Sequence, residues 1–270
     1  MNIAAIISSL KQAMEIKDLV SCFIVPINNF SINYINTFTI EEIKELNKIK
    51  PVFTIINKNI HNSELDDLKK ILQEIEKIDI SGIFFYDISL INLKNKLNLK
   101  TPLVWAQEHL TTNYQTINYW FNKGVKYVYL SSELTKNEID EIKEKSKAKV
   151  FVNVFGHIPM FTSRRHLVKN YLQHFSLKDE NKNKKIYKEN KYYPIFDNQN
   201  GTTVYSDYIL NILDEDLSKY DYIVFNSNFI NGEAFYDTLV KYNEKKEEYK
   251  FPYEHGFLYK ETIYRVKEHE

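Results

Sequence analysis

Short, almost wholly apolar runs alternate with amphipathic stretches along most of the chain. The apolar runs are rich in Ile, Val, Phe and Tyr, which is typical of strands that are covered on both faces. The stretches between them place apolar residues on one helical face, most clearly over Glu64–Ile78. The predicted strands are Ile3–Ile7, Cys22–Ile27, Val52–Asn57, Gly82–Asp87, Leu103–Gln107, Tyr127–Leu130, Lys149–Val154 and Tyr222–Asn226.

Helix signals separate most of these strands. Thr135 is followed three residues later by Glu138, a capping-box pattern that predicts a helix over Thr135–Ser146. Ile40–Ile49 has a similar amphipathic pattern. Strands that alternate with helices in this way favour a closed parallel sheet over an open one. We therefore expect an α/β protein with a single TIM-like (β/α)8 barrel over residues 1–270.

The regular order stops after the seventh predicted strand, because a long segment separates Val154 from Tyr222. It contains a predicted helix, HLVKNYLQHF, and a lysine-rich run, Asp179–Lys191, which we interpret as a solvated loop rather than a binding patch. The dipeptide Asn200-Gly201 predicts a hairpin turn. We expect residues 175–210 to form an insertion between strands 7 and 8, made of a loop and a hairpin, that serves as a lid or a docking element.

Charge and cysteine content narrow the function classes. The formal net charge is zero and the pI is about 7.1, which argues against broad electrostatic binding to nucleic acid or to an anionic membrane. No apolar run approaches the roughly 20 residues of a membrane span, and the chain does not open with an export segment, so we expect a cytoplasmic protein that does not bind membranes. The one cysteine, Cys22, cannot build an iron–sulfur cluster or a cysteine-ligated zinc site, and its mid-strand position predicts a buried core residue.

Polar residues follow several predicted strands. In α/β barrels the carboxyl ends of the strands carry the chemistry, so these residues are candidates for a pocket. The same residue types also cap helices and satisfy loop backbones, and both interpretations stay open here. The candidates are Asn57, Asp87, Gln107, Glu108, Ser131, Glu133, Gly156, His157 and Asn226.

The densest group of candidates lies in Val150–Tyr171. Gly156 allows close approach of a ligand, and His157 has the side chain suited to acid–base chemistry near neutral pH. A helix that begins near Arg164, capped by Ser163, would bind anions at its first turn. Arg164 and the adjacent Arg165 are two of only three arginines, and arginine is the residue that grips phosphate or carboxylate with two hydrogen bonds. The alternative is an ordinary charged surface helix.

Standard catalytic motifs are missing from the sequence. It has no G-x-x-x-x-G-K, G-x-G-x-x-G, G-x-S-x-G or H-E-x-x-H. Glu108, His109 and His157 are residue types that bind metals, but their spacing is not diagnostic, so we expect no metal site.

Several sequence blocks resemble the collagenase-like peptidase family U32, in particular its short members from Firmicutes and Mollicutes. The most specific blocks are FGHIPMFTSRRHLVKNYL and the closing HGFLYKETIYRVK. Further blocks resemble the family in the same order. The first, NTFTIEEIKELNKIKPVFTIINKNIHNSELDDL, includes a strand that ends in Asn57. The next contains Asp87, another runs from Gln107 to Asn113, and the last of them is YVYLSSELTKNEI. The resemblance covers essentially the whole chain and implies a barrel fold.

The resemblance also implies a function. Members carry the label peptidase or collagenase without an established catalytic class, whereas better understood relatives take part in oxygen-independent hydroxylation of tRNA wobble uridine, of a ribosomal cytidine or of ubiquinone precursors. Several of those relatives bind a four-iron cluster through four cysteines, work as pairs of paralogues and use a prephenate-like carboxylate. This sequence departs from them in having one cysteine, and in having Ser132 where the family commonly has arginine.

These observations support three hypotheses. In the first, the chain resembles the smaller subunit of the tRNA uridine-hydroxylation pair and works on tRNA with a longer paralogue that carries the cluster. In the second it is a peptidase, and in the third a non-catalytic binding subunit; the oligomeric state is left open. The candidate catalytic residues are His157, Glu133 and Asp87, and the candidate substrate-binding residues are Asn57, Gln107, Asn113, Gly156, Arg164 and Arg165.

Overall fold

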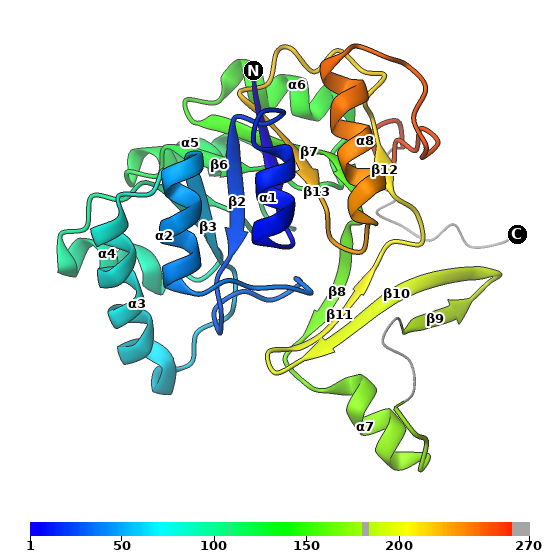
Figure 1. Cartoon of the computed structure of the whole chain (residues 1–270). Coiled ribbons are helices and arrows are strands. Elements are labelled where there is room, and N and C mark those ends of the chain that lie inside the picture. The colour runs from blue at the N-terminus through cyan, green and yellow to red at the C-terminus, as the bar shows by residue number, and fades with distance from the viewer. Residues whose placement is uncertain (108, 180–183, 261–270) are drawn as a thin grey trace, which may run out of the picture.

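The computed structural model describes residues 1–107, 109–179 and 184–260. Eight parallel strands form a closed barrel (Figure 1), in which each strand pairs with the next along the chain and the last pairs with the first. All the predicted strands are present, so the predicted fold class is confirmed. They are β1 (Asn2–Ile6), β2 (Cys22–Pro26), β3 (Val52–Ile56), β4 (Gly82–Phe85), β5 (Leu103–Trp105), β6 (Tyr127–Tyr129), β7 (Lys149–Gly156) and β13 (Tyr222–Asn226).

Helices cover the outside of the barrel. The predicted capping box is confirmed: Thr135 Oγ1 accepts from the amide of Glu138, and the Glu138 carboxylate accepts from the amide of Thr135. None of the helices in the described residues is long and apolar enough to cross a lipid bilayer. The outer helices are α1 (Leu10–Ile16), α2 (Ile40–Ile49), α3 (Leu65–Ile78) after the 3-10 turn η1 (Asn62–Glu64), α4 (Ser89–Leu97), α5 (Tyr114–Asn122), α6 (Lys136–Lys145) and α8 (Gly232–Asn243).

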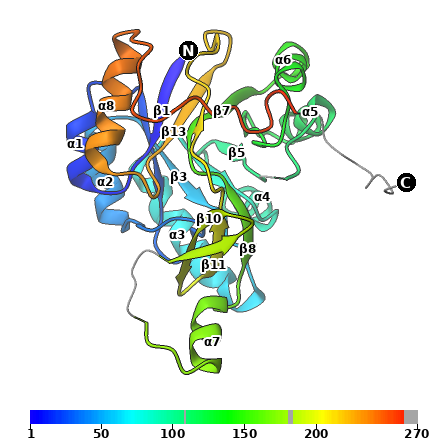
Figure 2. The same ribbon diagram turned by 90° about the vertical axis from the view of Figure 1, so that its right-hand side faces the viewer.

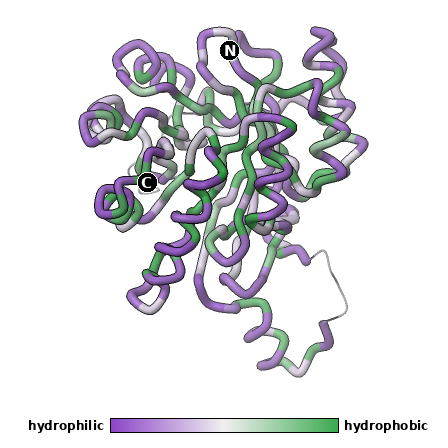
Figure 3. The backbone as a smooth tube through the Cα atoms, turned by 60° about the vertical axis from the view of Figure 1, so that its left-hand side comes forward, coloured by the Kyte–Doolittle hydropathy of each residue, from purple (hydrophilic) through white to green (hydrophobic). Residues whose placement is uncertain are grey.

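Two hydrophobic cores hold the barrel together. The larger lies between the strands and the helices, and the smaller fills the barrel interior. Aromatic rings fill much of the inner core: Phe53 and Phe84 contact Phe151 edge-on, and Phe151 stacks on Tyr222 at 4.1 Å between ring centroids. Cys22 also lies in this core, as predicted, and burial raises the pKa of its thiol to about 12. Figure 3 shows hydrophobic stretches along the central strands and hydrophilic turns on the surrounding helices.

A second, antiparallel sheet lies between β7 and β13 in the sequence. Its strand order is β8-β11-β10-β9, and it extends away from the barrel with α7 at its far end (Figures 1 and 2). β8 and α7 precede the range 175–210 that was assigned to the insertion from sequence. The elements of this segment are β8 (Pro159–Ser163), α7 (Leu167–His174), β9 (Lys185–Lys188), β10 (Lys191–Asn198), β11 (Gly201–Tyr205) and β12 (Leu210–Asn211).

The structure corrects one detail of this segment and refines another. The lysine-rich run is not all loop, because β9 and the start of β10 pair within it. The Asn200-Gly201 hairpin is confirmed, but Gly201 is the first residue of β11 rather than part of the turn. Its φ is +130°, and a Cβ atom there would lie 2.0 Å from the carbonyl oxygen of Ser163, so only glycine lets the end of β8 approach this closely.

Gly156, at the end of β7, is expected to be equally intolerant of a side chain. Its φ is +126°, and a Cβ atom would lie 2.5 Å from the backbone oxygen of Asn226. Gly156→Ala should therefore lower the free energy of unfolding, measured in urea, by at least about 2 kcal/mol. Gly232→Ala is the matched control, because nothing lies within 4 Å of its Cβ position. We expect the control to stay within about 1 kcal/mol of wild type. Equal stabilities for the two variants would show that Gly156 does tolerate a side chain.

Candidate functional site

Three asparagines point into the barrel at its carboxyl end, because side chains along each strand point alternately inward and outward. Asn57, Asn153 and Asn226 each stand two residues beyond an apolar side chain of the inner core, and alternate residues of a strand point to the same side. All three are buried. The layer above the aromatic interior is therefore built largely from amides.

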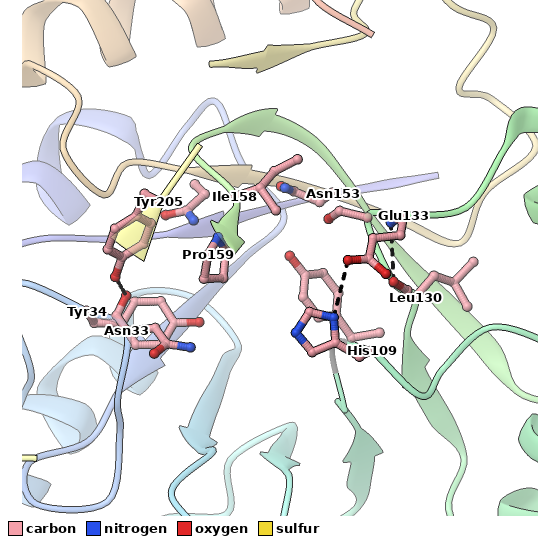
Figure 4. Close-up of a pocket in the computed structure, with 13 residues that line it drawn as sticks. Asn33, Tyr34, His109, Leu130, Glu133, Asn153, Ile158, Pro159 and Tyr205 are labelled. Carbon is pink, nitrogen blue, oxygen red and sulfur yellow. Dashed lines mark hydrogen bonds and ion pairs between the residues drawn. The ribbon is translucent and has the colours of Figure 1, made fainter. Parts of the chain in front are cut away.

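A pocket opens at this level, and we call it the mouth pocket (Figure 4). Its wall is made by side chains from loops and strands that are far apart in the sequence. The antiparallel sheet contributes Pro159 and Tyr205, so the pocket lies where that sheet meets the barrel. The other polar and aromatic lining residues are Asn33, Tyr34, His109, Tyr129, Ser131, Ser132, Glu133, Asn153 and Asn226.

Asn153 is the lining residue with the clearest capacity to bind a ligand. The residue is 7% exposed, and its Oδ1 is buried with no hydrogen-bond partner among the described residues. The neighbouring Asn226 differs, because its Oδ1 accepts from the amide of Asn228 at 3.0 Å. A buried acceptor without a partner costs roughly 1–3 kcal/mol, so a ligand N–H or O–H that reached Asn153 would recover that energy.

A histidine–carboxylate pair lies beside Asn153 on the wall of the same pocket. His109 Nδ1 lies 3.3 Å from Glu133 Oε1, and both side chains are about half exposed (Figure 4). His109 belongs to the β5–α5 loop and Glu133 to the β6–α6 loop, so the parallel pairing of β5 with β6 brings them together. This pair can exchange a proton with a ligand in the pocket.

Four other predicted site residues form hydrogen bonds to backbone groups. Asn57 bonds both the N–H and the carbonyl of Ile32, and so holds the β2–α2 loop. Asp87 accepts from the amides of Ile60 and Ser89, Gln107 Nε2 donates to the carbonyl of Tyr86, and Asn113 caps α5. Gln107 Oε1 is buried without a partner among the described residues, so it keeps one free acceptor. Their predicted roles in substrate binding or catalysis stay predictions.

His157 is buried behind the pocket and does not line it. Its Nδ1 lies 3.0 Å from the backbone oxygen of Ser206, which joins the end of β7 to the antiparallel sheet. Burial lowers the pKa of this imidazole, although the backbone hydrogen bond acts in the opposite direction. His157 is therefore neutral at pH 7, and its predicted catalytic role stays a prediction.

The two adjacent arginines are engaged differently. Arg164 donates to the backbone oxygen of Asn59 at 2.8 Å and contacts the Glu64 carboxylate at 3.3 Å. Arg165 is exposed and forms no ion pair within the described ranges. Glu64 also binds Lys58, whose ammonium is nearly buried, at 2.5 Å. Arg164 thus already has an acidic partner.

The predicted helix start near Arg164 is wrong. α7 begins at Leu167, because β8 continues to pair with β11 as far as Ser163. The amides of Leu167 and Lys169 donate to Thr202 Oγ1 and to the Asp197 carboxylate, so these two donors are already satisfied. Ser163 caps the turn before the helix by accepting from the amide of Arg165.

One group of metal-ligating residue types occurs in the part of the chain that the structure describes: Asp214, Glu215 and His255. Glu215 already contacts the ammonium of Lys136 and the hydroxyl of Tyr259, so it is neutralised without a metal. Of the trio considered from sequence, Glu108 lies outside the described residues.

The mouth-pocket residues that sequence reasoning missed are Asn33, Tyr34, Tyr129, Asn153 and Tyr205, and His109 was considered only as a metal ligand. Asn153 carried a signal, since it is the lone polar residue in the apolar run FVNVF. Asn33 and Tyr205 carried none, because only the tertiary structure places them at the mouth.

Comparison with known proteins finds sequences that are similar to this chain. The model of peptidase family U32 matches residues 23–225. The chain is 30% identical over 173 residues to tRNA hydroxylation protein P2 of Bacillus subtilis, which is 61% of this chain and 56% of that protein. It is 24% identical over 152 residues to tRNA hydroxylation protein P1 of the same organism, which is 54% of this chain and 35% of that protein. The matches therefore span about half of P2 and a third of P1.

Solved structures resemble this one in fold alone. A tryptophan synthase structure from Pyrococcus furiosus has a TM-score of 0.50 at 12% identity, over 90% of this chain and 98% of the other. A phosphoribosylanthranilate isomerase monomer from Thermotoga maritima has a TM-score of 0.50 at 9% identity, over 91% and 99%. Similarity at this level confirms the barrel and carries no functional information.

Removing the charge of Glu64 should destabilise the protein. Burial alone would raise the pKa of Glu64, but hydrogen bonds from Lys58, the His61 backbone and Arg164 outweigh it and lower the pKa to about 2. Glu64→Gln leaves the nearly buried Lys58 ammonium without its anionic partner and should cost about 2 kcal/mol of unfolding free energy at pH 7. The difference from wild type should shrink as the pH falls from 4.5 towards 2, where the carboxylate is lost.

The matched control is Glu45→Gln, which breaks the exposed pair with Lys48. We expect it to cost less than about 0.5 kcal/mol at pH 7. Equal effects of the two substitutions in urea titrations would show that the Glu64 cluster adds nothing beyond a surface ion pair.

His157 should make the stability of the protein depend on pH in a second range, above the one in which Glu64 titrates. The unfolded chain protonates this imidazole near pH 6.5, whereas the folded protein does so only at lower pH. The unfolded state therefore binds more protons in between, and stability should fall as the pH drops below about 6.5. His157→Asn keeps a donor for the Ser206 carbonyl but does not titrate. Between pH 7.5 and 5.5 the melting temperature of the variant should fall less steeply than that of the wild type. Parallel plots of melting temperature against pH would show that His157 does not cause the pH dependence.

Proposed function

The chain belongs to peptidase family U32, and from that premise we propose that it takes part in the hydroxylation of uridine in tRNA. The observation that carries this proposal is the 30% identity to tRNA hydroxylation protein P2 of Bacillus subtilis. Further relatives with the same kind of name come from Bacillus subtilis and Escherichia coli. The chain matches only part of each, so the activity, the substrate and the partners are proposed together.

The mouth pocket supports the proposal through its chemistry. Buried amides and tyrosines suit a planar, polar ligand, because rings stack on aromatic side chains and amides read N–H and carbonyl groups. Asn153 would accept a hydrogen bond from such a ligand, and a uracil ring offers one N–H between two carbonyls. We assign proton transfer to Glu133 with His109. We assign positioning to Asp87 and His157, because both form hydrogen bonds to the backbone.

We propose a partner chain on the basis of the cysteine content and of the relatives. The sequence has one cysteine, which is buried, so the four cysteines of such a cluster would lie outside this sequence. The 173 residues matched in P2 are 56% of that protein, whereas the 152 matched in P1 are 35%, so P1 is the longer of the two. We propose that this chain works beside a longer paralogue of that kind. A carboxylate ligand of the prephenate type remains a prediction, and Arg164 would have to release Glu64 to bind it.

No observation favours hydrolysis of peptides. In the described part of the chain, no serine or threonine hydroxyl is hydrogen-bonded to a histidine nitrogen, as a nucleophile with a general base would be. Burial raises the pKa of the Cys22 thiol to about 12, which keeps it protonated at neutral pH.

The test combines deletion of the gene with complementation. Deletion should remove 5-hydroxyuridine derivatives from digested tRNA, measured by nucleoside mass spectrometry, and the wild-type gene should restore them. Asn153→Leu should restore roughly a tenth of the wild-type level or less, because the ligand loses its buried acceptor. The same substitution should leave the unfolding free energy unchanged or raised, since it removes an acceptor that has no partner in the described structure.

Asn95→Leu is the matched control, because Asn95 is an exposed residue of α4. It should restore the modified nucleosides fully. Unchanged nucleoside levels after deletion would refute the proposed function. Full restoration by Asn153→Leu would leave the function in place and refute the assignment of the pocket.

A further inference from the structure

The charge of the chain is distributed unevenly. Residues 164–192 contain nine lysines and arginines and three carboxylates, a net charge of +6, whereas the chain as a whole is neutral. The rest of the chain therefore carries −6. The basic segment includes α7, β9 and the start of β10, which lie on the projecting part of the antiparallel sheet (Figures 1 and 2).

Exposed aromatic side chains are interleaved with these charges. Tyr187 on β9 and Tyr192 on β10 are paired across the two strands, with their ring centroids 4.9 Å apart and exposed fractions of 59% and 60%. The ammonium of Lys185 lies 6.0 Å from the centre of the Tyr192 ring. We call the β9–β10 ribbon, Lys185–Tyr193, the arm.

Structural needs of the sheet explain only part of this composition. β9 is the edge strand of its sheet, and lysines on an edge strand prevent pairing with other chains. Two adjacent tyrosines that are more than half exposed do not serve that purpose, because they leave apolar surface in water. The contact between the two rings stabilises the pairing of β9 with β10, and their exposed faces offer a surface to a partner.

The charge decides which class of partner fits. Tyrosine is common in both protein and nucleic-acid contacts, but lysine is depleted at protein interfaces and dominates contacts to phosphate. Aromatic rings flanked by lysines form the usual platform for unpaired bases, which stack on the rings while the phosphates meet the ammonium groups.

The neighbouring lysines are available for this contact to different degrees. Lys185 forms no ion pair among the described residues. Lys188 lies 3.6 Å from the exposed carboxylate of Glu189, a pair that water already weakens. Lys191 is held by Asp207 at 2.9 Å and is the least available.

We propose that the arm binds an unpaired stretch of RNA, with bases stacked on Tyr187 and Tyr192 and phosphates held by Lys185 and Lys188. The inference deepens the proposed function, on which it rests, by naming the surface that would hold the RNA. Because β11 of the same sheet supplies Tyr205 to the mouth pocket, RNA on the arm would be tethered to the element that borders the site.

The experiment measures binding of fluorescein-labelled RNA to the purified full chain by fluorescence anisotropy. The probes are a stem–loop with an unpaired loop and a blunt duplex of equal length. Tyr187→Ala and Tyr192→Ala should each weaken binding of the stem–loop by roughly tenfold, and should change binding of the duplex less than twofold. Lys185→Gln should lower the slope of log affinity against log salt by about 0.7.

Tyr119→Ala is the matched control. Tyr119 is 56% exposed on α5, and a lysine, Lys123, lies over its ring as Lys185 lies over Tyr192. It should leave the affinity for the stem–loop within twofold of wild type. Far-ultraviolet circular dichroism of each variant checks that the fold is retained.

Unchanged stem–loop affinity in both arm variants would overturn the proposal, and a protein would then be the expected partner of the two tyrosines. Equal losses for duplex and stem–loop would overturn the stacking of unpaired bases. The nucleoside assay separates this inference from the proposed function. Loss of RNA binding in the arm variants, together with normal nucleosides in the deletion strain, would uphold the arm and refute tRNA hydroxylation. The reverse pattern would refute the arm alone.

Discussion

The arrangement of the mouth depends on one asparagine in the β2–α2 loop. The backbone oxygen of Asn33 accepts from the Tyr205 hydroxyl and, at 2.9 Å, from Asn228. Its side-chain oxygen accepts from Thr162 on β8 and from Thr203 on β11. Four donors from the antiparallel sheet and the β13–α8 loop thus converge on one residue. Asn33 has a φ of +68°, a conformation that asparagine tolerates better than most residues.

This convergence attaches the near end of the antiparallel sheet to the mouth of the barrel. Each hydrogen bond contributes about 1 kcal/mol net, and together they determine where the sheet and the loop lie. The mouth pocket exists because that sheet brings Pro159 and Tyr205 beside the end of β7. The Glu64 cluster adds a second attachment on the other side, since Arg164, just after β8, reaches the loop that follows β3.

The antiparallel sheet links one wall of the mouth pocket to the arm. β11 pairs with β8 next to the pocket and with β10 on its other edge, and β10 pairs with β9, which carries Tyr187. A macromolecule held at the arm would therefore have a defined position relative to Asn153. Most buried polar groups around the mouth form hydrogen bonds, whereas Asn153 Oδ1 has no partner among the described residues. A buried polar atom without a hydrogen-bond partner is expected at functional sites.

The sequence by itself determined the elements of this protein. All eight barrel strands, the helix capped by Thr135 and the Asn-Gly hairpin follow from periodicity and turn chemistry, which are local properties. Candidates at strand ends, such as Asn57 and Glu133, followed from the rule that barrel chemistry lies at carboxyl ends. The tertiary structure alone decided that Glu133 meets His109, that Arg164 pairs with Glu64, and that Asn33 receives Tyr205. Those contacts join residues on different elements, and they form only once the strands have paired and the antiparallel sheet has docked at the mouth of the barrel.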